Sequence, residues 1–214
     1  MRALRRAWPF FVAVCALLGC DAYTEKRDRG DPSPPPSAAE DAGPGTDDAA
    51  LDPCALRQTY PPGPYGRAVG TRIENLSFVG LDNAPFDFAS LHADCTRTLL
   101  LVSTSAGWCT ACREEQPKLQ SLYENFSASG LVVVVTLFED DDFETAVLRD
   151  VEAWQRRYDL TFPVVLDAPF VLGDYYDRNS TPMNMLVDLR TMEIVTIQIG
   201  AVDSTFETIL EAKL

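Results

Sequence analysis

Two cysteines separated by two residues, Cys109 and Cys112, are the side chains of this 214-residue sequence best suited to chemistry. They follow Trp108 and stand where a helix is expected to begin, so unpaired backbone N–H groups and the helix dipole would stabilise a thiolate. We expect Cys109 to be the nucleophile and Cys112, one turn further on, to resolve a mixed disulfide. The alternatives are a structural disulfide or half of a zinc site, but no second cysteine pair or histidine cluster completes a metal shell.

Charge and composition exclude several other functions. The sequence has 18 Lys and Arg against 32 Asp and Glu, a formal net charge of −14. Nucleic-acid binding is disfavoured because it needs clustered positive charge. The single histidine, His92, excludes sites built from several imidazole ligands. We expect His92 on the surface, and we expect no metal site and no cofactor.

Hydrophobic patterns predict the elements that position the two cysteines. Apolar runs at 99–102 and 131–135 are typical of strands covered on both faces by helices. Between them, apolar residues recur at helical spacing over most of the stretch from Cys112 to Phe126, and Gly130 supplies a stop. The cysteines therefore stand at the carboxyl end of a central strand, within a β-α-β unit.

The remaining pattern predicts an α/β domain that ends in a hairpin and a helix. An edge strand is expected over 73–79, and Phe86 with Phe88 packs a short extension. The stripe of Val147, Val151, Trp154 and Tyr158 predicts a second helix. The later predicted elements are an apolar piece at 162–166, a short helix near 170–176, a hairpin of 183–187 with 194–199, and a helix beginning at 206–210.

Two further cysteines, Cys54 and Cys95, are available to form a second bond. Once Cys109 and Cys112 are paired, these two remain, and their bond would close a loop of about 41 residues with about 4 kcal/mol of stabilisation. We expect a structural disulfide. The alternative is a pair of independent thiols, one of which forms a second redox step with the Cys109 pair.

The first 53 residues carry export and tethering signals. Arginines followed by a short apolar stretch predict a signal peptide over residues 1–19, because the stretch is too short for a lasting membrane span. The segment 17–20 ends in Gly19 and Cys20 and resembles a bacterial lipobox, which implies lipidation of Cys20; ordinary signal cleavage nearby is the alternative. Residues 20–53 are rich in proline and acid and are predicted to be a disordered tether, which leaves 54–214 as the domain.

The domain resembles thioredoxin, and more narrowly the TlpA/ResA-like redoxin branch in its lipoprotein form. The resemblance rests on the Trp-Cys-x-x-Cys motif, Pro117 in the helix, Thr181-Pro182 before the hairpin and the segment 162–167. It implies a three-layer fold with a central mixed sheet and an N-terminal extension. It also implies a protein disulfide oxidoreductase in which Trp108, Thr181 and a cis Pro182 bind substrate.

Glu139 follows the second central strand, where the resemblance implies a carboxylate that accepts protons from the cysteines. Burial there would raise its pKa and suit it to that task. The alternative is that Glu139 belongs to a solvated acidic loop together with Asp140, Asp141, Asp142 and Glu144.

The resemblance also implies partners and a direction of electron flow. Electrons would come from a membrane donor and pass to exported protein thiols or disulfides, such as those of apocytochrome c. We expect a periplasm-facing monomer held to the membrane through its lipid anchor, in the inner or the outer membrane.

Two other functions remain as alternatives. A peroxiredoxin is disfavoured because its signature needs proline and Thr or Ser where this chain has Val102 and Ala106. A copper-binding chaperone is possible because two thiolates are soft ligands for Cu(I). Copper-delivery proteins of this fold, however, separate their cysteines by three residues and add a distant histidine.

Overall fold

The computed structural model describes residues 54–214. The predicted signal peptide, the lipidation of Cys20 and the predicted tether lie outside the described residues. The strands are β1 (Ser77–Val79), β2 (Pro85–Asp87), β3 (Leu99–Ser105), β4 (Leu131–Leu137), β5 (Val164–Leu166), β6 (Met183–Asp188) and β7 (Glu193–Ile199). The α-helices are α1 (Phe88–Ala93), α2 (Thr110–Phe126), α3 (Leu148–Arg157) and α4 (Ser204–Lys213).

All of these strands form one mixed sheet, in the order β2-β1-β5-β4-β3-β6-β7. The central strands β3 and β4 are parallel and paired from Leu99–Leu131 to Ser105–Leu137, and β5 continues the parallel part. Strand β6 is antiparallel to β3, and β7 is antiparallel to β6. The predicted central strands and the closing hairpin are thereby confirmed.

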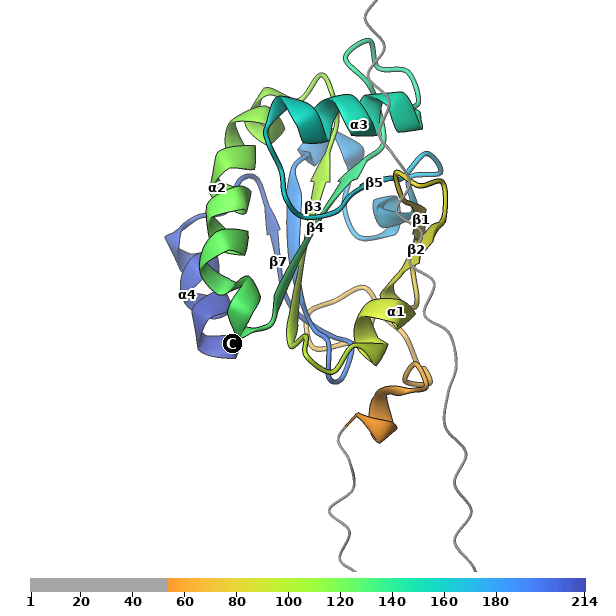
Figure 1. Ribbon diagram of the computed structural model, residues 1–214, viewed down its shortest axis with the longest axis vertical. Helices are drawn as coiled ribbons and strands as arrows, with labels where there is room; N and C mark the ends of the chain where they lie inside the picture. Colours follow the sequence, from red (N-terminus) through yellow and green to blue (C-terminus); the bar gives the residue numbers. More distant parts are fainter. Residues whose placement is uncertain (1–53) are drawn as a thin grey trace, which may run out of the picture. The chain divides into compact units, whose positions relative to one another are not determined.

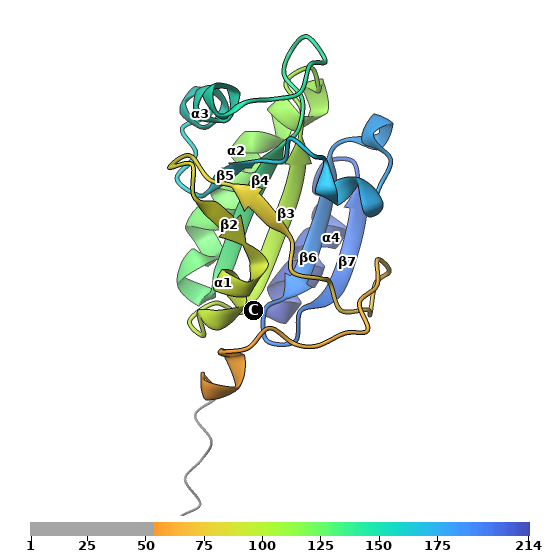
Figure 2. The same ribbon diagram turned by 90° about the vertical axis from the view of Figure 1, so that its right-hand side faces the viewer.

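Helices cover both faces of the sheet. Figures 1 and 2 show α2 and α4 on one face and α1 on the other. Successive residues of a strand point to opposite faces. Leu101 accordingly packs in one buried cluster with Leu119 of α2 and Phe206 of α4, whereas Leu100 packs in the other with Phe88 of α1. Both faces of β3 are covered, which explains its continuous apolar sequence.

Several predicted elements differ in extent from those observed. The strand expected over 73–79 is limited to β1, which pairs with both β2 and β5, so the edge of the sheet is β2. Val147 precedes α3 and is 48% exposed, so it does not belong to the core stripe. The helix expected near 170–176 is the 3₁₀ turn η3 (Val171–Asp174).

His92 is buried, and the prediction that it lies on the surface is wrong. Its side chain is 2% exposed, and Nδ1 lies 2.7 Å from the carbonyl oxygen of Leu189. Arg57 donates from Nε to the carbonyl oxygen of His92 at 2.6 Å. These contacts join residues far apart in the sequence. The residues next to His92 in the sequence therefore could not predict its burial.

A disulfide links Cys54 to Cys95 across 41 positions, with 5.4 Å between the Cα atoms. It fastens the first described turn, η1 (Ala55–Arg57), to the segment that leads into β3. Within residues 54–214, no helix combines the length and the apolar character needed to cross a membrane.

Candidate active site

Cys109 and Cys112 lie at the junction of β3 and α2. They form a disulfide with 5.3 Å between their Cα atoms. Cys109 is the N-cap of α2, and the backbone N–H of Cys112 points at its sulfur from 3.0 Å. A thiolate at Cys109 would therefore receive an N–H hydrogen bond and the positive end of the helix dipole. Cys109 is 4% exposed and Cys112 is fully buried.

The loop before β6 faces the disulfide from the other side. The peptide bond between Thr181 and Pro182 is cis. The carbonyl oxygen of Thr181 lies 3.7 Å from the sulfur of Cys109. The hydroxyl of Thr181 donates to the carbonyl oxygen of Arg178 at 2.8 Å, which helps to fix this loop. A backbone segment is thus presented directly beside the sulfur atom.

Thr104, on β3, connects the two halves of this site. Its carbonyl oxygen lies 3.8 Å from the sulfur of Cys112. Its hydroxyl accepts a hydrogen bond of 2.8 Å from the backbone N–H of Met183, the residue after Pro182. The same buried residue therefore contacts the second cysteine and the strand that carries Pro182.

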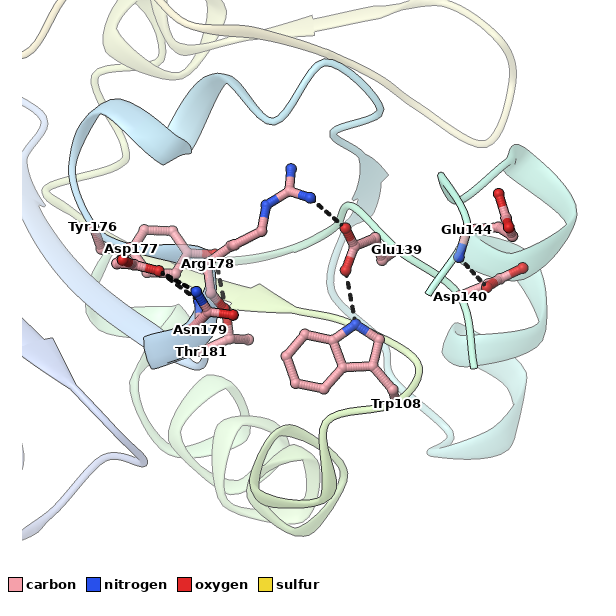
Figure 3. A network of polar contacts seen from close by, with 9 residues as sticks. All are labelled: Trp108, Glu139, Asp140, Glu144, Tyr176, Asp177, Arg178, Asn179 and Thr181. Carbon is pink, nitrogen blue, oxygen red and sulfur yellow. Dashed lines mark hydrogen bonds and ion pairs between the residues drawn. The ribbon is translucent and has the colours of Figure 1, made fainter. Parts of the chain in front are cut away.

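Glu139 forms a bridge between Trp108 and the loop before Pro182. The indole N–H of Trp108 donates to its Oε2 at 2.8 Å, and Arg178 donates to its Oε1 at 2.6 Å (Figure 3). Glu139 is 9% exposed, so it is separate from the solvated loop, of which Asp141, Asp142 and Glu144 are exposed. Its carboxylate therefore contacts both the residue before Cys109 and the turn before Thr181.

Arg178 extends the same network over two aromatic rings. Its guanidinium lies 4.7 Å from the centre of the Phe170 ring and 5.7 Å from that of Phe138. Arg178 belongs to the 3₁₀ turn η4 (Arg178–Ser180), which leads directly to Thr181. The turn before the cis peptide bond is therefore held by one ion pair and two cation–π contacts.

A buried carboxyl group, Glu115, was not identified from the sequence. It lies on α2 one turn after Cys112, and its Oε1 accepts hydrogen bonds from the Asn184 side chain at 2.8 Å and the Val202 backbone at 2.6 Å. Burial raises the pKa of Glu115, although these hydrogen bonds oppose the shift. The available signal was its position, three residues after Cys112 and four before Leu119, on the apolar stripe of the helix.

A family model matches most of the described domain. The model of the AhpC/TSA family covers residues 69–198, which include the cysteine pair, Glu139 and the Thr181–Pro182 bond. The chain belongs to this family. The AhpC/TSA match, the mixed sheet and the Cys-x-x-Cys pair together confirm the predicted thioredoxin-like fold and a thiol-disulfide oxidoreductase of the ResA type.

Relatives within the family carry names that agree with this chemistry. The thioredoxin-like protein YneN of Bacillus subtilis is 29% identical over 133 residues, 62% of this chain and 73% of its own length. The thiol-disulfide oxidoreductase ResA of Bacillus cereus is 30% identical over 81 residues, 38% of this chain. The match spans 43% of the length of ResA.

Solved structures support the fold. The thioredoxin domain of a thiol-disulfide oxidoreductase from Bacteroides vulgatus superposes with a TM-score of 0.56 and 19% identity, over 70% of this chain and all of that one. A thioredoxin-family thiol:disulfide interchange protein from Chlorobium tepidum gives 0.52 and 20% identity, over 69% of this chain and 99% of that one.

One more buried carboxyl group supports the site in this family member. Asp167, directly after β5, accepts hydrogen bonds from the backbone N–H groups of Val171 at 2.7 Å and Leu172 at 3.3 Å. Burial raises the pKa of Asp167 to about 6, and the hydrogen bonds oppose the rise. Asp167 thereby fixes the start of the turn η3. Phe170 directly precedes this turn, and its ring lies under the guanidinium of Arg178.

The structure brings the predicted site residues together in two groups. Trp108, Cys109, Cys112, Thr181 and Pro182 meet at the β3–α2 junction, with Glu139 beside Trp108. The Cys54–Cys95 bond lies before β3, at the opposite end of that strand from the Cys109 pair.

Proposed function

We propose that this protein is an exported, membrane-tethered reductant whose Cys109–Cys112 dithiol exchanges with disulfides of other exported proteins and reduces them to thiols. The observation that supports the proposal best is the setting of Cys109. Its sulfur caps a helix, accepts the N–H of Cys112, and lies beside the carbonyl of Thr181. A helix N-terminus stabilises a thiolate, and a nearby backbone carbonyl offers an edge on which an extended substrate can pair.

The exchange proceeds in two thiolate–disulfide steps. The Cys109 thiolate attacks one sulfur of a substrate disulfide, so the substrate S–S bond breaks, a mixed disulfide forms and the first substrate sulfur leaves as a thiolate. The Cys112 thiolate then attacks the Cys109 sulfur. The mixed disulfide breaks, and the second substrate sulfur leaves as a thiolate. Two electrons, together with two protons, pass from the protein dithiol to the substrate, and the Cys109–Cys112 bond is formed.

Three residues would hold the substrate while these bonds change. The backbone of Thr181 would pair with the incoming polypeptide, the ring of cis Pro182 would lie against the cysteine pair, and Trp108 would supply an aromatic wall. The contacts of Thr181 and Trp108 with Arg178 and Glu139 favour these roles, because they fix both sides of the site. No cofactor takes part in this scheme.

Export and tethering rest on the N-terminal sequence. The basic start, the short apolar stretch and Gly19-Cys20 support signal processing and lipidation of Cys20. The Cys54–Cys95 bond agrees with an oxidising compartment outside the cytoplasm. A membrane dithiol would then supply electrons, and apocytochrome c cysteines are the proposed substrates by resemblance. Separation of the inner and outer membranes would show which of the two holds the lipid anchor.

Serine variants of the two active cysteines test the catalytic assignment. The Cys109→Ser variant of the full chain should lose disulfide reductase activity, whereas Cys112→Ser should trap a mixed disulfide with a protein substrate. Glu114→Gln, an exposed change on α2, is the matched control and should retain full activity. Full activity in the Cys109→Ser variant would overturn the proposal.

Metabolic labelling tests the anchor separately. Bacteria that express the full chain should incorporate labelled palmitate into it, and Cys20→Ala should abolish the label and release the protein from the membrane fraction. Labelling that persists in Cys20→Ala would place the lipid elsewhere. The result of this labelling experiment does not affect the interpretation of the Cys109→Ser variant.

A further inference from the structure

Phe143 is an exposed aromatic residue in an unfavourable backbone conformation. Its side chain is 67% exposed, and its φ of 64° lies in the left-handed region that bulky residues rarely adopt. The ring is stacked on Trp108, with centroids 5.2 Å apart and an angle of 13° between the planes. A large apolar ring in a strained position on the surface points to a role in binding.

The loop that carries Phe143 is fixed in place by its own hydrogen bonds. The carboxylate of Asp140 accepts the backbone N–H groups of Asp142 at 2.9 Å and Glu144 at 3.0 Å. The N–H of Asp140 in turn donates to the carbonyl oxygen of Glu144 at 2.9 Å. These bonds close a tight turn with Phe143 near its tip.

The same loop is packed closely against the residue before Trp108. A Cβ atom added to Gly107 would lie 2.5 Å from backbone atoms of both Asp140 and Asp141. The N–H of Gly107 donates to the carbonyl oxygen of Glu139 at 2.8 Å. The position of Phe143 is therefore set relative to the Cys-x-x-Cys motif, which begins two residues after Gly107.

We propose that Trp108 and Phe143 form an aromatic ledge that selects substrates with an aromatic or large apolar side chain beside the reacting cysteine. This inference rests on the proposed function and names its substrate class. A substrate cysteine bonded to Cys109 brings its neighbouring residues next to Trp108, because Trp108 precedes Cys109 in the chain. An aromatic side chain there can pack against the ledge with the geometry that ring pairs prefer.

The charge around the ledge specifies the rest of the substrate segment. Asp142 and Glu144, on either side of Phe143, are exposed, and in the described part of the chain neither lies within 4.0 Å of a cationic group. Asp141 is at 4.0 Å from Arg113 and is partly neutralised by it. The preferred substrate therefore carries Lys or Arg next to its apolar residue, since opposite charge speeds association and like charge slows it.

Disulfide-bridged peptides of equal length test this preference with the reduced full-length protein. Each peptide contains two cysteines, and the residues beside the first cysteine are Phe-Lys, Ser-Lys or Phe-Glu. The peptide disulfide accepts two electrons and two protons from Cys109 and Cys112, which become a disulfide. The measured quantity is the second-order rate constant for the appearance of the peptide dithiol.

We expect Phe-Lys to be reduced about tenfold faster than Ser-Lys, near the upper end of what one aromatic contact contributes. Phe143→Asn should remove this ratio, because asparagine tolerates the left-handed backbone and lacks the ring. Val69→Ala is the control and should keep the ratio. Val69 is also exposed, but it lies far from the cysteines. The backbone N–H of its neighbour Gly70 donates to the carbonyl oxygen of Ile194, which lies at the end of β7 away from the cysteine pair.

A charge variant tests the second half of the inference. Combining Asp142→Asn with Glu144→Gln should abolish the preference for Phe-Lys over Phe-Glu and leave the Phe-to-Ser ratio intact. Equal rates for all three peptides, or a Phe-to-Ser ratio that survives in Phe143→Asn, would overturn the ledge while leaving disulfide reduction established. Failure of the proposed function would appear differently, as peptide reduction that does not need Cys109.

Discussion

Glu139 and Arg178 form an ion pair, with 2.6 Å between Oε1 and Nη1, that ties the loop after β4 to the turn before Pro182. The same carboxylate holds the indole of Trp108. The residue before the nucleophile and the loop beside it are therefore positioned by one side chain. These contacts give Glu139 a role in positioning, and its role as a proton acceptor for the cysteines, which the family resemblance implies, stays a prediction.

Removal of Arg178 should loosen this arrangement. Arg178→Ala leaves the nearly buried Glu139 with Trp108 alone, and it should lower the free energy of unfolding by about 1 kcal/mol, because half-exposed ion pairs contribute little more. The rate with protein substrates should fall as well. Urea denaturation measures the first effect. Arg149→Ala, at an exposed pair with Asp150, is the control; an equal loss in both variants would contradict the special role of Arg178.

Glu115 should influence the ionisation of the cysteine pair. It lies one helical turn from Cys112, so the two Cβ atoms are about 5–6 Å apart, and a carboxylate there opposes the formation of a thiolate. Glu115→Gln should therefore lower the apparent pKa of the thiols by about one unit. The pH profile of alkylation of the reduced protein measures this shift. Glu114→Gln, its exposed neighbour, should leave the profile unchanged; a profile unmoved by Glu115→Gln would contradict the coupling.

Asp167 should make stability depend on pH in a specific window. Its pKa is raised to about 6 in the folded protein, above the ordinary unfolded value of about 3.9. Between about pH 4 and about pH 6, Asp167 is therefore protonated in the folded state and ionised in the unfolded state. The free energy of unfolding falls as the pH rises through this window, by about 3 kcal/mol in total. Relative to wild type, Asp167→Asn should show a flatter curve of unfolding free energy over that range. Parallel curves would contradict the shift.

The elements around the cysteines could be predicted from the sequence because their signals are local. Continuous apolar runs predict β3 and β4, and helical spacing with the Cys-x-x-Cys motif predicts α2. The contacts that complete the site are long-range. Arg178 reaches Glu139 across 39 positions, and Asn184 reaches Glu115 across 69. No local pattern indicates such pairings, so the network around Glu139 and the burial of Glu115 emerge only from the folded chain.

His92 illustrates the same limit for burial. It stands in a stretch that also contains Ser90 and Asp94, and such a stretch is typical of the surface. Leu189, 97 positions away, nevertheless supplies a carbonyl partner for its ring. The helix α1 was missed for a related reason: it is short, and its N-cap is Asp87, whose side chain accepts the N–H of Ser90. Short elements that depend on one cap and on tertiary packing leave little hydrophobic periodicity to detect.

The Cys54–Cys95 bond should contribute to stability and not to catalysis. Its loop of 41 positions implies a loss of about 2–4 kcal/mol when both cysteines are replaced by alanine. Chemical denaturation measures the loss, and the double variant should still reduce disulfides at the wild-type rate. The Cys109→Ser, Cys112→Ser pair opens only a short loop and should cost less stability. A double Cys54, Cys95 variant that is stable but inactive would assign these cysteines to a second redox step.

The reduction potential of the Cys109–Cys112 pair tests the central claim most directly. It can be measured on the full chain equilibrated in dithiothreitol or glutathione buffers, with Trp108 fluorescence as the reporter. Because Phe143 is stacked on Trp108, the Phe143→Asn variant should alter this fluorescence and thereby shows that the signal comes from Trp108. A reductant requires a value near that of thioredoxin, about −270 mV. A value near about −120 mV would instead identify an oxidant that inserts disulfides, and it would contradict the proposed direction of electron flow.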